Sequence, residues 1–276
     1  MTIAINTNLT SMHAQNSLAK TQNALSTSFA RLSSGLRINS AADDAAGLGI
    51  AKSMNAQVRS YAVAERNTND GISMLQTADG GADEIHNLMT RMRELAVQAS
   101  NGSLSANDST NLDAEYQQSA SEIDRISQST QFNGINLLSG VAATKNFQVG
   151  IGTAATDRIS VSFGGADVTR LLGATATDVT TFAKAQTAIT ALDTGIQALS
   201  AVRAGFGAAM NRFSNTVSNL QTMQTNTSAA LSRIQDTDVA AETANLSKNQ
   251  VLSQAGAAIL AQANQTPQLA LSLLRG

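Results

Sequence analysis

Few residues in this sequence have the types and spacing that catalysis or metal binding requires. The 276 residues include no cysteine and two histidines, His13 and His86, which fall in separate helical patterns. Asp83 and Glu84 lie just before His86, and carboxylate and imidazole groups are common metal ligands. Acidic residues are also favoured in the first turn of a helix, because they offset the positive end of its dipole. We therefore interpret this group as a helix start, and the sequence predicts no metal site.

Two further patterns resemble sites of chemistry. Residues 150–155 read Gly-Ile-Gly-Thr-Ala-Ala, a loose form of the glycine-rich loop that binds dinucleotides between a strand and a helix. Here the loop leads into a second strand pattern, so no nucleotide site is expected. Asp43 and Asp44 could be read as paired carboxylates for acid–base catalysis, but a role in a chain joint or a helix start is the better interpretation. The sequence predicts a protein that is not an enzyme and has no cofactor.

The composition favours a protein that associates with its own copies. Charged residues make up 14% of the chain and aromatic residues 3%, so the surface is polar but has little charge to repel a second copy. A formal net charge of −2 offers no basic surface to nucleic acid. No apolar run approaches the ~20 residues that span a bilayer, and the amino terminus lacks a secretory signal pattern. We expect no nucleic-acid or membrane partner.

An amphipathic helix is predicted for residues 1–40, after a short extended lead. Its apolar seam has helical spacing and comprises Leu18, Leu25, Phe29, Leu32 and Leu36. Residues 32–47 then interrupt the pattern with Gly35, an Asn39-Ser40 turn and Asp43, the first acidic residue of the chain. Because the helical pattern resumes afterwards, we interpret this segment as a joint between two helical regions.

Two antiparallel helices are expected after the joint. A seam at alternating steps of four and three covers residues 54–99, although the Gly80-Gly81 pair should weaken the helix. Asn101-Gly102 should end that helix. Ser105 and Asp108 then form a capping-box pattern that opens the second helix.

A β-hairpin is predicted in the middle of the chain, where the period of the hydrophobic pattern changes to two. The alternating residues are Phe147, Val149 and Ile151 on one side and Ile159, Val161 and Phe163 on the other. A turn-rich stretch follows, and the next helix should begin near Thr177-Asp178.

The last third of the chain returns to the helical period. A long helix is predicted up to residue 234, a second joint at residues 235–238, and an alanine-rich helix over residues 239–276. Each terminal helix can pair only with the other or with other copies. We therefore predict a mainly α fold, a long antiparallel helical bundle or coiled-coil rod with a small β-hairpin and paired N- and C-terminal helices.

Several runs of residues resemble bacterial flagellin. Residues 32–49 are similar to the amino-terminal signature of that family, and residues 271–275, Leu-Ser-Leu-Leu-Arg, are similar to its ending. Further similar runs lie at residues 92–98, 122–126 and 130–134. The runs occur in the family's order and cover both ends and most of the chain, whereas the variable outer domains of longer flagellins are absent.

The resemblance implies a structural subunit of the bacterial flagellar filament, the extracellular helical propeller for swimming. It implies export of the unfolded chain through a type III channel, without a cleaved signal peptide, and polymerisation at the distal tip. Residues 1–40 and 236–276 would form an inner terminal coiled-coil domain, and residues 41–235 an outer helical rod domain with the hairpin near residues 145–165. Expected partners are copies of the chain, hook-associated and cap proteins, and an export chaperone at the C-terminal segment.

Candidate site residues follow from the resemblance. The inner coiled coil, where polymerisation is expected, comprises Leu18, Leu25, Phe29, Leu32, Leu36, Leu260, Leu271 and Leu274. The joints, expected to act as spokes between the two domains, comprise Gly35, Arg37, Asn39, Asp43, Asp44, Gly47, Asp236 and Asp238. A hook–filament junction protein, which shares the terminal arms and the export route but assembles into a short ring, stays open as the alternative.

The resemblance also indicates the flagellin-sensing Toll-like receptor as a partner. Arg91, Leu95 and Gln98 have helical spacing and share one face, and Glu115 lies on the next helix. These positions fall where the receptor motif lies in many flagellins. The alternative is that Leu95 belongs to the seam and that the other three side chains face solvent or neighbouring subunits.

Overall fold

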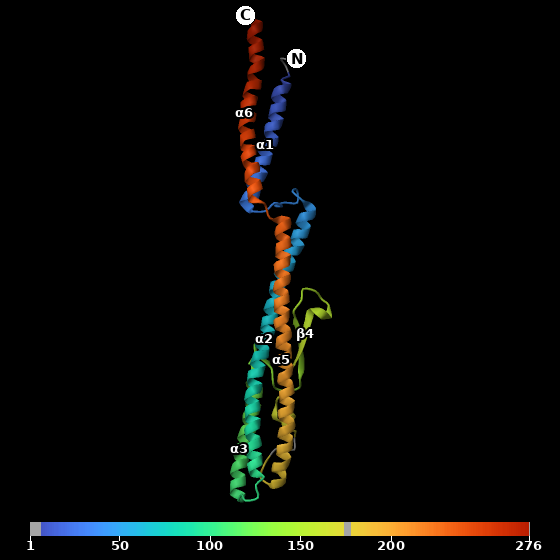
Figure 1. Cartoon of the computed structure of the whole chain (residues 1–276), viewed down its shortest axis with the longest axis vertical. Coiled ribbons are helices and arrows are strands. Elements are labelled where there is room, and N and C mark those ends of the chain that lie inside the picture. Colours follow the sequence, from blue (N-terminus) through green and yellow to red (C-terminus); the bar gives the residue numbers. More distant parts are fainter. Residues whose placement is uncertain (1–6, 174–177, 276) are drawn as a thin grey trace. The chain divides into compact units, whose positions relative to one another are not determined.

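The computed structural model describes the backbone of residues 7–173 and 178–275, and the side chains as far as residue 265. The chain is mainly α, as predicted (Figure 1). Its helices are α1 (Leu9–Ser34), α2 (Ala45–Ala99), α3 (Ala106–Ser129), the short α4 (Val168–Leu172), α5 (Phe182–Gln235) and α6 (Val239–Arg275). None of the described helices is both long enough and apolar enough to cross a membrane.

The chain divides into two compact units. Unit 1 comprises residues 1–58 and 226–276, and unit 2 comprises residues 59–225. In unit 1, α1 and α6 lie side by side and run in opposite directions (Figure 1). The predicted pairing of the two terminal helices is therefore confirmed.

The hydrophobic core lies in unit 2, where α2 packs against α5 and α3. Its largest fully buried side chains are Tyr116, Phe206, Phe213, Leu75, Ile85, Met89, Met92, Leu95, Ile123, Leu137, Leu138 and Leu192. Aromatic side chains of the hairpin pack against α5. The ring centroids of Phe147 and Phe213 are 5.3 Å apart, and those of Phe163 and Phe206 are 5.7 Å apart.

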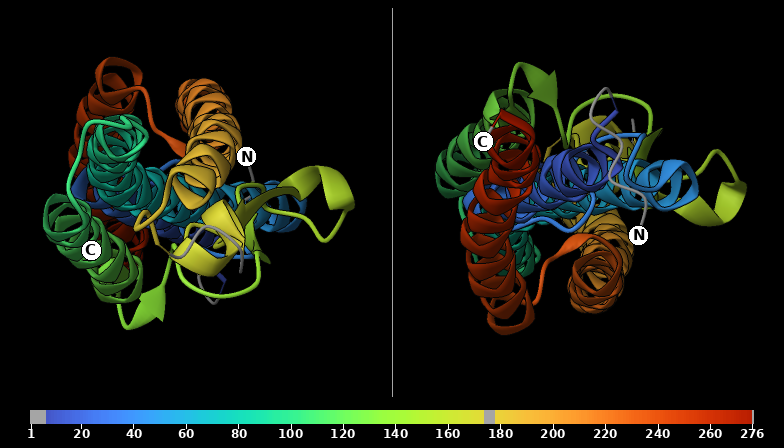
Figure 2. Two further views of the ribbon diagram at one scale, coloured as in Figure 1. Left: turned by 90° about the horizontal axis from the view of Figure 1, so that it is seen from below. Right: turned by 90° about the horizontal axis from the view of Figure 1, so that it is seen from above.

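The predicted hairpin is present. Strands β3 (Ala143–Gln148) and β4 (Arg158–Phe163) are antiparallel, with Phe147 opposite Ile159. Strand β3 ends at Gln148, so Val149 and Ile151 lie in the connecting loop rather than in the strand. This loop contains the 3-10 turn η1 (Ala155–Asp157) and projects sideways from the helices of unit 2 (Figure 2).

A second, smaller hairpin was not predicted. Strands β1 (Gln131–Phe132) and β2 (Ile135–Asn136) are joined by Asn133 and Gly134, whose φ angles are 48° and 76°. Two consecutive positive φ values are typical of the type I′ turn, which favours Asn-Gly. The sequence signal was present, but the strands are too short for their hydrophobic pattern to be recognised.

Several predicted boundaries change. The first helix ends at Ser34, ahead of Gly35. Helix α5 was predicted to begin near Thr177-Asp178 but begins at Phe182; Asp178 is not helical, and Thr177 lies outside the described residues. The capping box of Ser105 and Asp108 is confirmed, with Ser105 Oγ accepting from the Asp108 N–H at 3.2 Å. The Gly80-Gly81 pair does not interrupt α2.

Candidate functional site

The first joint is tied to the second by backbone hydrogen bonds within unit 1. Leu36 and Asp236 form an antiparallel bridge. Beside it, the Arg37 N–H donates to the Gln235 carbonyl at 2.6 Å, and the Thr237 N–H donates to the Gly35 carbonyl at 3.0 Å. The Arg37 guanidinium also donates to the Ile234 carbonyl at 2.6 Å. The two joints, about 200 residues apart in the sequence, therefore form one structure.

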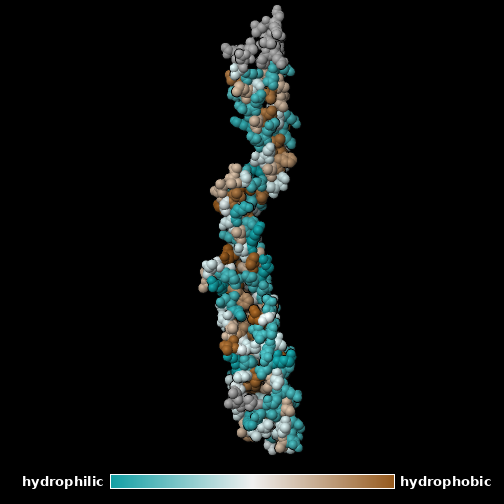
Figure 3. All heavy atoms as spheres, turned by 180° about the vertical axis from the view of Figure 1, so that it is seen from behind, coloured by the Kyte–Doolittle hydropathy of each residue, from teal (hydrophilic) through white to brown (hydrophobic). Residues whose placement is uncertain are grey.

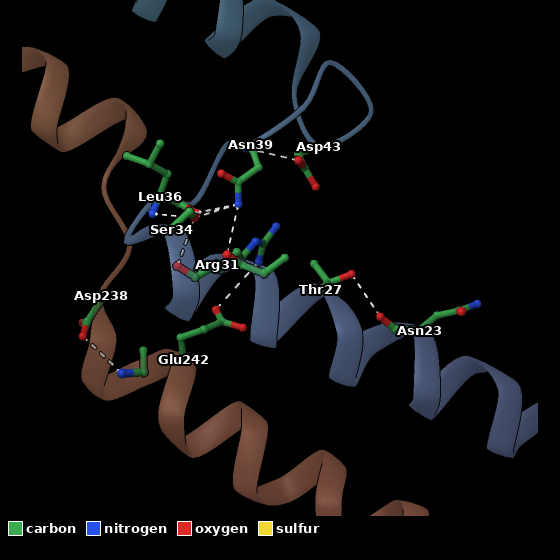
Figure 4. Close-up of polar contacts among 11 residues, drawn as sticks. Asn23, Thr27, Arg31, Ser34, Leu36, Asn39, Asp43, Asp238 and Glu242 are labelled. Carbon is green, nitrogen blue, oxygen red and sulfur yellow. Dashed lines mark hydrogen bonds and ion pairs between the residues drawn. The ribbon is translucent and has the colours of Figure 1, made fainter.

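Gly35 ends α1 in a conformation that favours glycine. Its φ is +72°, and its N–H donates to the Arg31 carbonyl at 2.8 Å, which closes the last turn of the helix. Asn39 stabilises the chain reversal, since its side-chain amide donates to Ser34 Oγ at 2.9 Å and to the Leu36 carbonyl at 3.4 Å (Figure 4). Residues 35–44 are thus a non-helical segment between α1 and α2.

The two carboxylates of the joint act separately. Asp43 accepts from the Ser40 N–H at 2.8 Å, from the Ser40 hydroxyl at 2.9 Å and from the Asn39 N–H at 3.2 Å. These hydrogen bonds, led by the Ser40 backbone, lower the pKa of Asp43 from its usual 3.8. Asp44 instead caps α2 by accepting from the Gly47 N–H at 2.8 Å. The pair is a turn and a helix cap, not a pair of catalytic carboxylates.

A side chain at position 47 would crowd two neighbouring side chains and force them to shift. A Cβ atom there would overlap the Asp44 carboxylate and the Ile38 side chain, which is buried. The cap of α6 has a similar design, in which Asp238 accepts from the Ala240 N–H at 2.9 Å. Both joints therefore end in an aspartate that starts the following helix.

An ion pair joins α1 to α6 next to the joint. Arg31 Nη1 lies 3.8 Å from Glu242 Oε2, and Glu242 is only 8% exposed (Figure 4). The Arg31 Nε atom is buried and has no hydrogen-bond partner among the described residues. Neither Arg31 nor Glu242 was predicted from the sequence, because the prediction of the seam relied on the spacing of apolar residues.

The seam between α1 and α6 is made largely of small and polar side chains. Its inward positions follow strict steps of three and four residues. On α1 they are Ser11, Ala14, Leu18, Thr21, Leu25, Ser28 and Leu32, and on α6 they are Glu242, Leu246, Asn249, Ser253, Gly256, Leu260 and Ala263. Ser11 donates to Asn264 across the pair at 2.8 Å.

One predicted seam residue lies elsewhere. Phe29 is 64% exposed, because it follows the inward-facing Ser28 and points away from α6. Leu18, Leu25, Leu32 and Leu260 are half-buried in the seam, and Leu36 is half-buried in the joint. The side chains of Leu271 and Leu274 lie outside the described residues.

The positions of the receptor motif do not share one exposed face. Leu95 is 1% exposed and belongs to the core of unit 2, whereas Arg91 and Gln98 are exposed. Arg91 pairs with Glu115 of α3 at 2.7 Å and with Glu94 at 3.0 Å, and these hydrogen bonds, Glu115 first, raise the pKa of the Arg91 guanidinium. The burial of Leu95 agrees with its interpretation as a seam residue rather than as a receptor contact.

The group Asp83, Glu84 and His86 is not a helix start. It lies in the interior of α2, so the dipole explanation is wrong. Asp83 instead pairs with Arg203 of α5 at 2.7 Å, and Arg203 also pairs with Asp79 at 2.9 Å. No group of three potential metal ligands lies together among the described residues.

The glycine-rich loop of residues 150–155 encloses a side chain of the protein itself. A Cβ atom on Gly150 or on Gly152 would collide with the Asp157 carboxylate, which accepts from the Ala154 N–H at 3.2 Å. The loop leads into β4, as expected, rather than into a helix. The glycines are therefore explained by the fold of the loop.

Comparisons with known proteins show the family to which the chain belongs. Residues 5–143 match the family described as bacterial flagellin N-terminal helical region, and residues 189–274 match the bacterial flagellin C-terminal helical region. The chain is 43% identical over 272 residues to a flagellin of Halalkalibacterium halodurans, covering 98% of this chain and 99% of that protein. It is 41% identical over 302 residues to a flagellin of Bacillus subtilis, with coverage of 98% and 99%.

A solved structure agrees with this assignment. The crystal structure of Bacillus cereus flagellin is 37% identical, covers 60% of this chain and 94% of that one, and has a TM-score of 0.50. A hook-associated protein from Vibrio parahaemolyticus has a TM-score of 0.51 at 16% identity, which shows a shared fold alone. The chain belongs to the bacterial flagellins, non-enzymatic structural subunits of the extracellular flagellar filament.

Proposed function

We propose that the terminal helices and their joints form the inner domain of the filament, over residues 1–40 and 236–276, and that residues 41–235 form its outer rod. The observation that carries this proposal is the apolar surface that α1 and α6 leave uncovered after pairing with each other. Its exposed members are Leu9, Met12, Phe29, Val239, Val251, Leu252 and Ile259. Burying such side chains against neighbouring copies would supply a hydrophobic driving force for assembly.

The composition of the seam supports the same role. Because Ser, Thr, Asn and Glu occupy many inward positions, α1 and α6 gain little apolar burial from each other. Such helices are marginal as an isolated pair and gain order when further surfaces cover them. Helix content should therefore rise when subunits polymerise, and unchanged far-UV circular dichroism would contradict this.

Seeded filament growth tests which surface assembles. In Val251→Ser/Ile259→Ser the two substituted side chains, 64% and 61% exposed, lose their apolar surface. We expect filament mass in a sedimentation assay to fall by about tenfold or more, while the melting of the unit 2 core is unchanged. Val141→Ser is the matched control, since Val141 is 74% exposed in a loop of unit 2. Equal losses in both proteins would overturn the assignment.

We further propose the joint as the spoke between the inner and outer domains, because backbone hydrogen bonds tie it to the second joint and both its carboxylates are used in a turn and a cap. Export as an unfolded chain through the type III channel and growth at the distal tip fit a sequence with no cysteine and one proline, which forms no disulfides and has one X-Pro bond to isomerise. Hook-associated proteins, the cap and a chaperone on the C-terminal segment remain the proposed partners.

The Toll-like receptor also remains a proposed partner, now on a smaller set of residues. Arg91, Gln98 and Glu115 present exposed side chains, and the ion pair between Arg91 and Glu115 fixes two of them together. Leu95 supports this surface from below and offers the receptor no contact.

A further inference from the structure

The charges of unit 2 are unevenly distributed along its length. Around the hairpin, residues 59–70, 141–163 and 204–225 contain five cationic and three acidic side chains, whereas residues 71–140 and 164–203 contain six cationic and twelve acidic ones. Helix α3 lies at the end of unit 2 opposite the hairpin loop (Figure 1). Unit 2 is therefore basic around the hairpin and acidic toward α3.

A basic cleft lies between the hairpin loop and the long helices. Its main cavity, about 820 Å³, is lined by Tyr61, Arg158, Arg212 and Met223, among others. A second hollow of about 490 Å³ on the other side of the loop is lined by Arg59 and again by Arg158. We call the surface formed by Arg59, Arg158 and Arg212 the basic cleft; Asp157 is its one carboxylate.

The arginines of the basic cleft are exposed and have no ionic partner among the described residues, and the Arg158 guanidinium donates to the Thr153 carbonyl at 3.0 Å. Neither Arg59, Arg158 nor Arg212 forms an ion pair within the described chain, and the Asp157 carboxylate is held by the backbone of its own loop. By contrast, every arginine in residues 71–140 and 164–203 of unit 2 has an ionic partner. Those paired arginines are Arg91, Arg93, Arg125, Arg170 and Arg203.

An acidic line runs along α3. Asp108, Glu115 and Glu122 are spaced by seven residues, so they lie on one face at intervals of about 10.5 Å. Glu115 and Glu122 keep 47% and 41% of their side chains exposed even though each pairs with an arginine. We call these three residues the acidic stripe; α3 contains five carboxylates and a single cation, Arg125.

We propose that the basic cleft of one subunit receives the acidic stripe of a second copy of the same chain. The inference rests on the proposed filament function, in which each contact joins one surface of a subunit to a different surface of the next subunit. Two different patches that complement each other make a head-to-tail contact, and repetition of such a contact builds an open helical polymer. Opposite charges on the two ends of unit 2 also disfavour head-to-head pairing, which would bring like charges together.

The surface around these residues suits a polar contact. Figure 3 shows the apolar residues of one face as small separate areas among polar ones. Charge pairs then set register and orientation, while Tyr61 and Met223 in the cleft supply apolar surface beside the arginines.

The test uses two charge-reversed full-length chains. Protein A carries Arg59→Glu/Arg212→Glu in the cleft, and protein B carries Glu115→Lys/Glu122→Lys in the stripe. When A or B polymerises by itself, the substituted residues bring like charges together at the contact. Elongation of each protein from seeds of the same protein should therefore slow by about tenfold or more. In an equimolar mixture, the cleft of A meets the stripe of B and the cleft of B meets the stripe of A. The mixture should therefore recover about half or more of the elongation rate that A and B each lose. The filaments that grow from it should contain both chains.

Two controls distinguish loss of the proposed contact from loss of folding and from failure of the chain to form filaments at all. Circular dichroism melts of A and B establish that the monomers are folded, and Arg59→Gln/Arg212→Gln repeats the cleft test without reversal should A be unstable. Wild-type chain under the same conditions reports filament formation itself, so its failure would count against the filament function. Growth of A and B at wild-type rates, or a mixture that grows no faster than its components, overturns the proposed contact.

Discussion

Arg31 of α1 and Glu242 of α6 form the ion pair that joins the terminal helices beside the joint, at 3.8 Å and with Glu242 almost fully buried. A carboxylate in that position is stabilised by its partner, and a guanidinium left without it is not readily solvated. The pair therefore ties α1 to α6 beside the joint.

Glu242→Gln should loosen this end of unit 1. The amide keeps the size of the side chain but removes the charge, so we expect a loss of about 1–3 kcal/mol in the stability of the helix pair. The loss should be visible as an earlier fall in helical circular dichroism on heating. Glu84→Gln is the control, since Glu84 is exposed on α2 and has no ion pair among the described residues; equal melting of both variants would contradict the prediction.

The turn at Asp43 should depend on pH. Its pKa is lowered in the folded chain, so the carboxylate stabilises the turn at pH above 3.8 and this contribution is lost as the pH falls through the lowered value. Hydrogen exchange of the Ser40 amide, corrected for its intrinsic rate, should accelerate below that point. In Asp43→Asn the pH dependence should disappear, and its persistence would assign the effect to another group.

Two glycines should respond to alanine in opposite directions. Gly35 has a φ of +72°, where a Cβ atom is strained, so Gly35→Ala should cost about 1 kcal/mol. Gly49 lies within α2 with open space around it, so Gly49→Ala should stabilise the helix by roughly 0.5–1 kcal/mol. Thermal melts of the two variants beside the wild type decide the signs, and a shift in the same direction would refute the conformational argument.

Receptor signalling should separate Arg91 from Leu95. Arg91→Ala should reduce signalling with little change in melting temperature, because the side chain is exposed. Leu95→Ala should cost about 2–4 kcal/mol by leaving a cavity in the core, and any lost signalling should follow the loss of folded protein. Full signalling by Arg91→Ala in a responsive wild-type background would exclude the receptor surface.

Local signals were readable from the sequence, and contacts between distant segments were not. The Ser105 cap and the β3–β4 hairpin depend on residues a few positions apart, so their patterns sufficed. Phe29 and Ser28 are both compatible with a helical seam, and only the approach of α6 decides which one faces inward. The Gly80-Gly81 pair was read as a weak point, but Gly81 lies against Thr130 and Leu138 from another part of the chain, where a Cβ atom would collide.

The distribution of burial between the units has a thermodynamic consequence. In the described part of unit 1 the buried apolar residues are Ile38 and Ala51, whereas the continuous apolar cluster lies wholly in unit 2. Opening of α1 and α6 in a free subunit thus exposes little apolar surface and needs little free energy, while unit 2 stays folded. The soluble chain should unfold in two stages, with its terminal helices as the labile stage and the first to be cut by a protease.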